Sequence, residues 1–401
     1  MNDSPDPNLR VLIVTGDFPP HLGGIGDYSE KLADAMNKLH GVTCDVLTTK
    51  PSSTSPDDGV TRSFNLMRSV PDWTFAHRKF ILDVVRNYDV INIQYPGVAY
   101  GRKPFINLLP TLMRTGATHV ASTVTIHDFR VMSQKWRLRT WPMLNTVHGV
   151  VHVDPGDWPV IRKWITRFKA PPSACVPIAS NVEVLPCSAS DRVAWREQLD
   201  IADDELAVAY FGVIYLHKGI DEMFEAVRRV RKSTGRKIHN IILGDFDREE
   251  PELQQLQRRI ESEPWTTWVR RATLEQVSRG LHASDFCALP FHSGTSINRS
   301  SMLAALAHGL PTVTTRGHVT PPDILTRFDL LLVAPKSVDE LAREIQRLVT
   351  DDALRAKMRA SSQDPLRQVT WEAVARKTAD FYASISKRRV HLPDSFPRLA
   401  S

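Results

Sequence analysis

The sequence has no long apolar run and only a few cysteines. A helix that crosses a bilayer needs about 18 to 20 consecutive apolar residues, and no segment of the 401-residue chain is that apolar. The cysteines are scattered and show no C-x-x-C spacing: they are Cys44, Cys175, Cys187 and Cys287. We expect reduced thiols and no disulfide or zinc site. The polar segment MNDSPDPNLR does not resemble a secretory signal, so a cytoplasmic location is expected.

The charge balance is mildly basic. The formal net charge is +6, and the sequence pI is about 9.1. An ordinary solvated surface, an anionic substrate and peripheral contact with the inner face of a membrane all fit this balance. No zinc-finger spacing, basic zipper or aromatic RNA-binding motif is present, so no nucleic-acid partner is expected.

Short apolar runs alternate with helical patterns along nearly the whole chain. In the first half the runs are RVLIVTG, TCDVLTT, DVINIQY, HVASTVTIH, GVVHVDP and ACVPIAS. In the second half they are LAVAYFG, HNIILGD, TTWVRR, DFCALPF, LPTVTT and DLLLVAP. Continuous apolar strands separated by helices are typical of parallel sheets covered on both faces. The two series predict an α/β protein with two Rossmann-like, doubly wound domains.

Strand signals stop near residues 183–192, where proline, serine and charged residues accumulate. We therefore predict an N-terminal domain over 1–185 and a C-terminal domain over 186–369. One more amphipathic helix is predicted over 370–388, followed by a poorly ordered tail over 389–401.

A glycine-rich junction, FPPHLGGIGDYSEKLADAM, follows the first strand. Apolar residues at helical spacing form the stripe of the next helix: Tyr28, Leu32, Ala35, Met36 and Leu39. Gly23, Gly24 and Gly26 therefore lie where that helix begins. Glycine has no Cβ to hold a ligand away, and helix N-termini bind phosphates. A turn without a ligand is the alternative, because the pattern is not G-x-G-x-x-G.

Two stretches of the second half repeat this strand, turn and helix arrangement. In YFGVIYLHKGIDEMFEAVRRV, Lys218 stands beside Gly219 and could pair with a diphosphate, although a solvated surface lysine fits equally well. In DFCALPFHSGTSINRSSMLAALAHGLPTVTT, a helix is predicted from about Ile297, and four residues could offer amides to an anion: Gly294, Thr295, Ser296 and Ile297. Arg299 in the first turn would oppose the helix dipole, which favours a negative ligand.

His127 and Asp128 follow an apolar strand in STVTIHDFR. Ligands of doubly wound sheets bind at the carboxyl ends of strands, and a histidine there can exchange protons near neutral pH. A structural histidine is the alternative.

Together these stretches resemble the group 1 (family 4) glycosyltransferases of the GT-B fold. The resemblance rests on FPPHLGGIGDY, INIQY, TIHDF, PIASN, YFGVIYLHKGID, LGD, the strand, loop and helix of 285–309, and AHGLPTVTT, and it covers about residues 10–385. It implies two Rossmann-like domains facing a cleft, with a final helix that crosses back to the first domain.

The resemblance also implies roles for individual residues. Gly23 and Gly24 match the glycine loop near the donor diphosphate, and His127 matches a catalytic histidine on the acceptor side. The other donor-binding positions are Gly212, Lys218, Gly294, Thr295, Ser296, Ile297 and Arg299. The acceptor-side positions are Gln94, Tyr95 and Asp128.

Three positions depart from the family pattern. Val213 stands where many members have an arginine. The family's Glu-x7-Glu carboxylates are replaced by Ser296 and Ala304, so the usual ribose contact is missing. Arg299 could supply the cation that Val213 lacks.

We therefore expect a retaining glycosyltransferase that moves a sugar from a nucleotide diphosphate sugar donor to a hydroxyl of a polysaccharide or lipid-linked glycan. Neither a metal nor another cofactor is expected. Two alternatives stay open: a non-catalytic nucleotide-sugar or glycan-binding protein, and another two-domain Rossmann enzyme such as a sugar-nucleotide epimerase.

Overall fold

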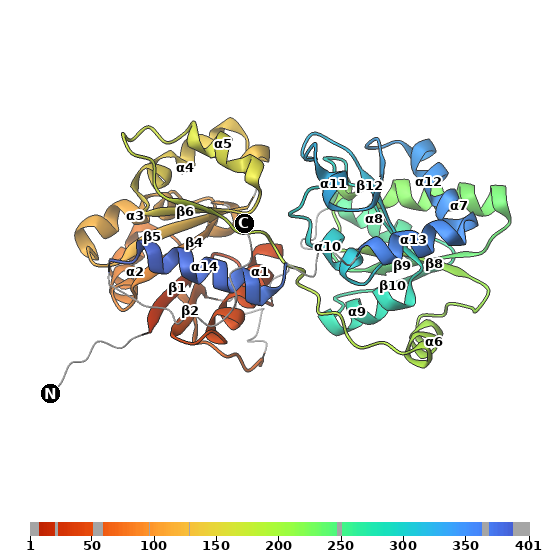
Figure 1. Ribbon diagram of the computed structural model, residues 1–401, viewed down its shortest axis with the longest axis horizontal. Coiled ribbons are helices and arrows are strands. Elements are labelled where there is room, and N and C mark those ends of the chain that lie inside the picture. Colours follow the sequence, from red (N-terminus) through yellow and green to blue (C-terminus); the bar gives the residue numbers. More distant parts are fainter. Residues whose placement is uncertain are drawn as a thin grey trace. The chain divides into compact units, whose positions relative to one another are not determined.

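The chain forms two compact units (Figure 1). The computed structural model describes residues 8–20, 23–50, 59–95, 97–127, 129–246, 251–362 and 369–387. Unit 1 comprises Met1–Ile178 and Trp371–Ser401, and unit 2 comprises Ala179–Thr370. The predicted tail over 389–401 lies outside the described residues.

Unit 1 is built on a parallel sheet of seven strands in the order β3-β2-β1-β4-β5-β6-β7. The strands are β1 (Leu9–Val14), β2 (Val42–Thr49), β3 (Leu66–Val70), β4 (Val90–Tyr95), β5 (Ala121–Ile126), β6 (Gly149–His152) and β7 (Ser173–Cys175). The α-helices are α1 (Gly24–Asn37), α2 (Arg78–Val85), α3 (Phe105–Gly116), α4 (Gln134–Thr146), α5 (Trp158–Arg162) and α14 (Trp371–Ile385). Strands β1, β4 and β5 are almost entirely buried, as continuous apolar runs require.

Helix α14 joins the end of the chain to unit 1 by packing against α1. Its inner face carries Val374, Thr378 and Tyr382, all buried. The approach to β6 is close, because a Cβ added at Gly149 would lie 2.8 Å from Cζ of Phe381.

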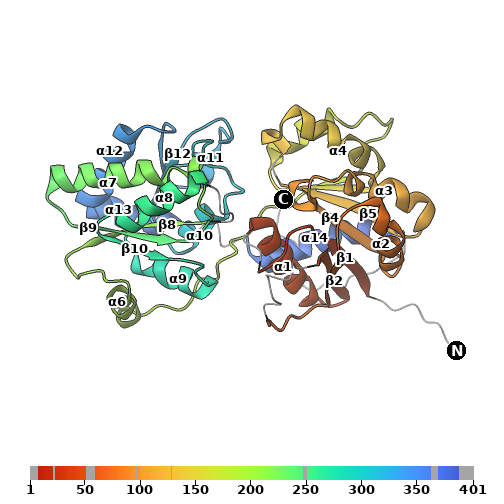
Figure 2. The ribbon, with the colours of Figure 1, turned by 180° about the vertical axis from the view of Figure 1, so that it is seen from behind.

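Unit 2 contains a parallel sheet of six strands in the order β10-β9-β8-β11-β12-β13. The strands are β8 (Leu206–Phe211), β9 (Ile238–Leu243), β10 (Thr266–Val269), β11 (Phe286–Leu289), β12 (Thr312–Thr315) and β13 (Leu330–Val333). The helices are α6 (Ala189–Gln198), α7 (Ile220–Thr234), α8 (Pro251–Ser262), α9 (Leu274–Ala283), α10 (Ser300–Ala307), α11 (Ile324–Arg327), α12 (Val338–Thr350) and α13 (Asp352–Ser362). Helices α7 and α12 pack side by side, as both views show (Figures 1 and 2).

The two doubly wound parallel sheets confirm the predicted fold class. Two local predictions were incomplete or wrong. Strand β3 was not foreseen, because only its last residue, Val70, is fully buried and it includes Arg68. Helix α10 begins at Ser300 and not near Ile297, so Arg299 is its N-cap residue and lies before the first turn.

Candidate active site

The turn after β8 in unit 2 places Lys218 at the start of α7. A short 3-10 helix, Leu216–Lys218, leads to Gly219, which caps α7 with φ of 77°. A Cβ at Gly219 would lie 2.1 Å from the carbonyl oxygen of Pro290. Glycine is therefore required here by both backbone conformation and packing, and it holds this turn against the end of β11.

Two cations from separate turns approach one aromatic ring at the end of β11. The Nζ atom of Lys218 lies 5.1 Å from the ring centroid of Phe291, and Cζ of Arg299 lies 4.7 Å from it. The guanidinium of Arg299 also donates to Oγ of Ser293 at 2.7 Å. Strands β8 and β11 are parallel neighbours in the sheet. The turns that carry Lys218 and Arg299 therefore meet at the carboxyl ends of these two strands.

The loop before α10 offers fewer amides to an anion than the sequence predicts. The amide of Gly294 donates to the carbonyl of Phe291 at 3.1 Å, and that of Thr295 donates to Thr315 at 2.8 Å. Thr295 is also fully buried. Within the described residues no acceptor is present for the amides of Ser296 and Ile297, so these two are the better placed donors of the predicted set.

Several basic side chains lie near Lys218. The pKa of His217 is lowered, first by burial and then by Lys218, His292 and Arg299. The imidazole of His292 lies 2.7 Å from a carboxylate oxygen of Glu222. The cations Lys218 and Arg299 would favour a negative ligand at the carboxyl end of these strands.

Ser296 and Ala304 stand at the two positions where the family pattern has carboxylates. Ser296 is 8% exposed and Ala304 is fully buried within unit 2. Gly212, with φ of 128°, faces Ser301, whose Cβ would lie 3.6 Å from a Cβ added at Gly212. A ribose near α10 would therefore meet small side chains and backbone.

In unit 1 the space beside the first two glycines at the N-terminus of α1 is not filled by described residues. Gly23 is the N-cap residue, and a Cβ added at either Gly23 or Gly24 would meet no atom of the described residues within 4 Å. By contrast, a Cβ at Gly26 would lie 3.1 Å from Cα of Phe18. Packing thus accounts for Gly26 but not for Gly23 or Gly24.

His127 lies at the carboxyl end of β5, on a buried chain of polar side chains. Its Nε2 lies 2.8 Å from Oε1 of Gln94, and the amide nitrogen of Gln94 donates to Oδ1 of Asn92 at 2.6 Å. Because a carbonyl oxygen only accepts hydrogen bonds, Nε2 of His127 carries the proton in this arrangement. Burial lowers the pKa of His127 to about 4, so the ring is neutral at pH 7.

The aromatic ring of Tyr28 stands edge-on to His127, with ring centroids 4.9 Å apart. Tyr28 belongs to the buried stripe of α1, so the glycine-led helix and His127 are joined within unit 1. The spacing of the stripe predicted burial of Tyr28 but gave no signal for this contact. Asn92 was also missed, because a polar residue within an apolar strand gives no indication of its partner.

The predicted acceptor-side residues have different surroundings. Gln94 is fully buried and holds His127, while Tyr95 is fully buried with its hydroxyl 3.0 Å from the amide nitrogen of Asn107. In this conformation neither side chain reaches the surface. Asp128 lies outside the described residues.

A known family of proteins matches the sequence of most of unit 2. Residues 191–364 match the sequence model of the family described as "Glycosyl transferases group 1". A curated protein of Corynebacterium glutamicum, a GDP-mannose-dependent monoacylated alpha-(1-6)-phosphatidylinositol monomannoside mannosyltransferase, is 21% identical over 94% of this chain and 98% of its own length. A D-inositol 3-phosphate glycosyltransferase of Corynebacterium aurimucosum is 24% identical over 60% of this chain and 58% of its own length.

Solved structures share the fold over both units. Sucrose-phosphate synthase of Thermosynechococcus elongatus superposes with a TM-score of 0.72 at 18% identity and covers 94% of this chain and 99% of its own. Anabaena HepE in complex with UDP-glucose gives a TM-score of 0.71 at 15% identity, covering 94% of this chain and 100% of its own. At these identities the likeness establishes the fold, which is of the GT-B type.

Proposed function

We propose that this chain, a group 1 glycosyltransferase with the GT-B fold, transfers a hexose from a nucleotide diphosphate sugar to a hydroxyl of a lipid-linked glycan, with retention of configuration. The observation that carries the proposal is the convergence of Lys218 and Arg299 on Phe291. Two cations from separate turns meet beside two helix N-termini, an arrangement suited to a diphosphate.

The chemistry that we assign to unit 2 is stabilisation of the leaving group. As the bond between the sugar and the diphosphate breaks, negative charge develops on the departing phosphate. Lys218, Arg299 and the amides of Ser296 and Ile297 would bind that charge from fixed positions. Donors held in place before the reaction stabilise the transition state without a reorganisation cost.

In unit 1 we assign His127 to the acceptor and the reacting sugar. Its low pKa argues for a neutral hydrogen-bonding group and against a base that is protonated and deprotonated near pH 7. Gln94 fixes the proton on Nε2 and so orients the ring. Gly23 and Gly24 would let the donor approach the amides at the start of α1.

The relatives' names guide the choice of substrates. Both are glycosyltransferases of inositol-containing acceptors by name, and one uses GDP-mannose. We therefore propose GDP-mannose as the first donor to test and a phosphatidylinositol mannoside as the first acceptor. The other nucleotide sugar to test is UDP-glucose, which is bound in the HepE structure.

The positions of Ser296 and Ala304 favour one competing function, a protein that binds nucleotide sugars without transferring them. Both carboxylates of the family pattern are missing there, and the resemblance implies that the second, at the position of Ala304, is the one that usually contacts ribose. The two functions differ in turnover: a transferase releases the nucleoside diphosphate and lengthens the acceptor, whereas a binding protein does neither.

The deciding experiment incubates the protein with GDP-mannose and phosphatidylinositol monomannoside, then detects the glycolipid by mass spectrometry. A product one hexose heavier is expected, and nuclear magnetic resonance of its anomeric centre should show the donor's configuration. Inversion would refute the retaining assignment. Tight nucleotide binding with no product from either donor would favour the binding protein.

A further inference from the structure

The net positive charge of the protein comes from one part of unit 1. Residues 90–182 contain eleven lysines and arginines but three acids, a net charge of +8, whereas the whole chain carries +6. The remaining residues therefore have a net charge of −2. Two of the three acids, Asp154 and Asp157, form ion pairs with Arg130. Nearly all the other cations of this region have no acid in the region to pair with.

These cations gather in three segments that touch one another: 101–103, helix α4 (Gln134–Thr146) and 162–169. We name them together the basic face. Arg139 of α4 donates to the carbonyl of Arg102 at 2.7 Å, and Asn145 of α4 donates to the carbonyl of Trp164 at 3.1 Å. Hydrogen bonds thus fix both neighbouring segments against α4.

Large apolar side chains project from the same face. Phe168 is fully exposed, Leu138 is 65% exposed, and Trp141 is 42% exposed. Around them, Lys135, Lys163 and Lys169 are exposed. Across the described parts of residues 90–182, the ion pairs are those of Arg130, so these lysines are not neutralised there.

We propose that the basic face binds the surface of an anionic lipid bilayer. Cations without neighbouring acids complement anionic headgroups, and each contributes on the order of 1 kcal/mol near such a surface. Aromatic and leucine side chains that project outward can enter the boundary between headgroups and acyl chains. A single-stranded nucleic acid fits less well, because Leu138 offers no ring for a base to stack on.

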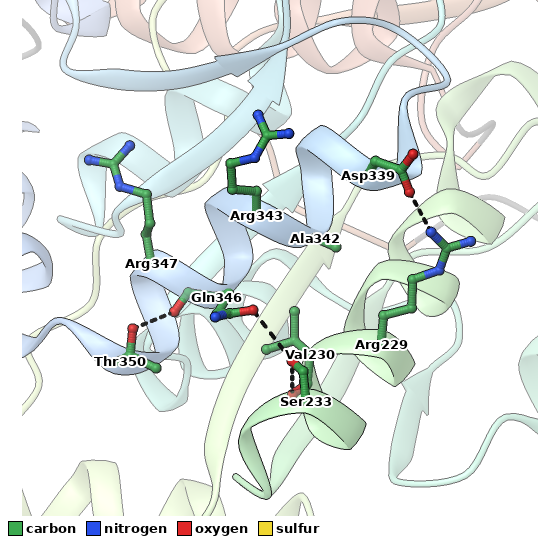
Figure 3. A pocket seen from close by; sticks show the side chains of 9 residues that line it. All are labelled: Arg229, Val230, Ser233, Asp339, Ala342, Arg343, Gln346, Arg347 and Thr350. Atoms are coloured by element: carbon green, nitrogen blue, oxygen red, sulfur yellow. Dashed lines mark hydrogen bonds and ion pairs between the residues drawn. The ribbon is translucent and has the colours of Figure 1, made fainter.

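Unit 2 has another surface that is lined by arginines, and it differs from the basic face. A groove between α7 and α12 is lined by Arg229, Arg343 and Arg347 (Figure 3). Arg229 pairs with Asp339 at 2.6 Å, and Arg347 pairs with Glu344 at 2.6 Å. Acids therefore offset this groove, and none of the large exposed apolar side chains of the described residues lines it. Arg343 of this groove and Lys357 of α13 therefore serve as control positions in unit 2.

The test measures sedimentation of the full chain with phosphatidylcholine vesicles, with and without phosphatidylglycerol, in the absence of donor and acceptor. The wild type should sediment only with the anionic vesicles, and salt should weaken this binding. K163E/K169E should bind about 25-fold or more weakly, at roughly fivefold per lost cation. L138S/F168S should also bind more weakly, by roughly tenfold per side chain.

The control is R343E/K357E, which makes the same charge change on exposed residues of unit 2 and should bind as the wild type does. Equal losses in this control, binding independent of phosphatidylglycerol, or no sedimentation would each overturn the proposal. The proposal would also be overturned if the wild type bound DNA, or associated with itself, without binding vesicles, and if K163E/K169E abolished that interaction. Vesicle binding needs no sugar transfer, so its outcome is separate from that of the proposed reaction.

Discussion

Substitution of Gly24 by valine separates a ligand-binding role of the glycine junction from a structural one. Gly24 is the exposed first residue of α1, and across the part of the chain that the structure describes no atom lies within 4 Å of a Cβ added there. Its φ lies outside the left-handed region, so valine adds no backbone strain. Valine is also a better helix former than glycine by roughly 0.3 to 0.5 kcal/mol. The melting temperature should therefore stay within about 2 °C of the wild type.

Activity should respond differently, because the valine side chain fills space that a donor phosphate would occupy. Loss of one charge-assisted contact costs on the order of 1.5–3 kcal/mol, so kcat/KM should fall roughly tenfold to a hundredfold. The assay measures turnover per folded molecule, with folding checked by circular dichroism.

The matched control is Gly26→Ala, whose Cβ would lie 3.1 Å from Cα of Phe18. This change should lower the melting temperature, with turnover per folded molecule near that of the wild type, because overpacking costs about 1–3 kcal/mol. If Gly24→Val keeps normal turnover per folded molecule, Gly24 does not face a ligand and our assignment of this junction is wrong.

Three further predictions concern other parts of the two units. Lys218→Ala and Arg299→Ala should each weaken binding of a nucleoside diphosphate roughly tenfold or more in calorimetry; unchanged affinity in both would refute the assigned phosphate site. Gly219→Ala should lower the melting temperature of unit 2, because the added Cβ would lie 2.1 Å from the carbonyl of Pro290; an unchanged melting temperature would show that the turn relaxes freely. Because the pKa of His127 is about 4 in the folded chain and near 6.5 when unfolded, the unfolded state binds a proton first as pH falls, so stability drops by about 3 kcal/mol between pH 6.5 and 4. His127→Gln should reduce that drop in urea titrations, and an identical pH dependence would contradict the burial argument.

The strands were predictable from the sequence wherever they are buried on both faces. The run VLIV is short, rich in β-branched residues and followed by turn signals, which favours a parallel strand covered on both faces. Strand β3, Leu66–Val70, gives no such signal, since it is at the sheet edge and only partly buried.

The start of α10 could not be located from local sequence. Several serines and Asn298 could each precede a helix, and tertiary contacts decide among them. The amide of Thr295 is held by Thr315, and a Cβ at Gly294 would lie 2.3 Å from the amide nitrogen of Gly317. The loop is thus fixed against residues far along the chain, and the helix begins only after it.

The sequence singles out the charged residues of the candidate site, but it does not show how they are arranged. Lys218 and Arg299 stand out because each lies next to a turn at a strand end. Their common contact, Phe291, depends on the neighbouring places of β8 and β11 in the sheet. Tyr95 illustrates the opposite difficulty, because an aromatic residue at a strand end looks the same in sequence whether it lies in the core or at a surface.

The most direct test of the central claim is transfer of mannose from GDP-mannose to phosphatidylinositol monomannoside by the wild type and by K218A/R299A. We expect the wild type to yield a glycolipid one hexose heavier. The double variant should remain folded and lose at least about a hundredfold in kcat/KM, since each cation contributes roughly tenfold. Equal transfer by both proteins would contradict the assignment of Lys218 and Arg299 to the donor diphosphate. Nucleotide binding without transfer from any donor by the wild type would contradict the proposed enzymatic function itself.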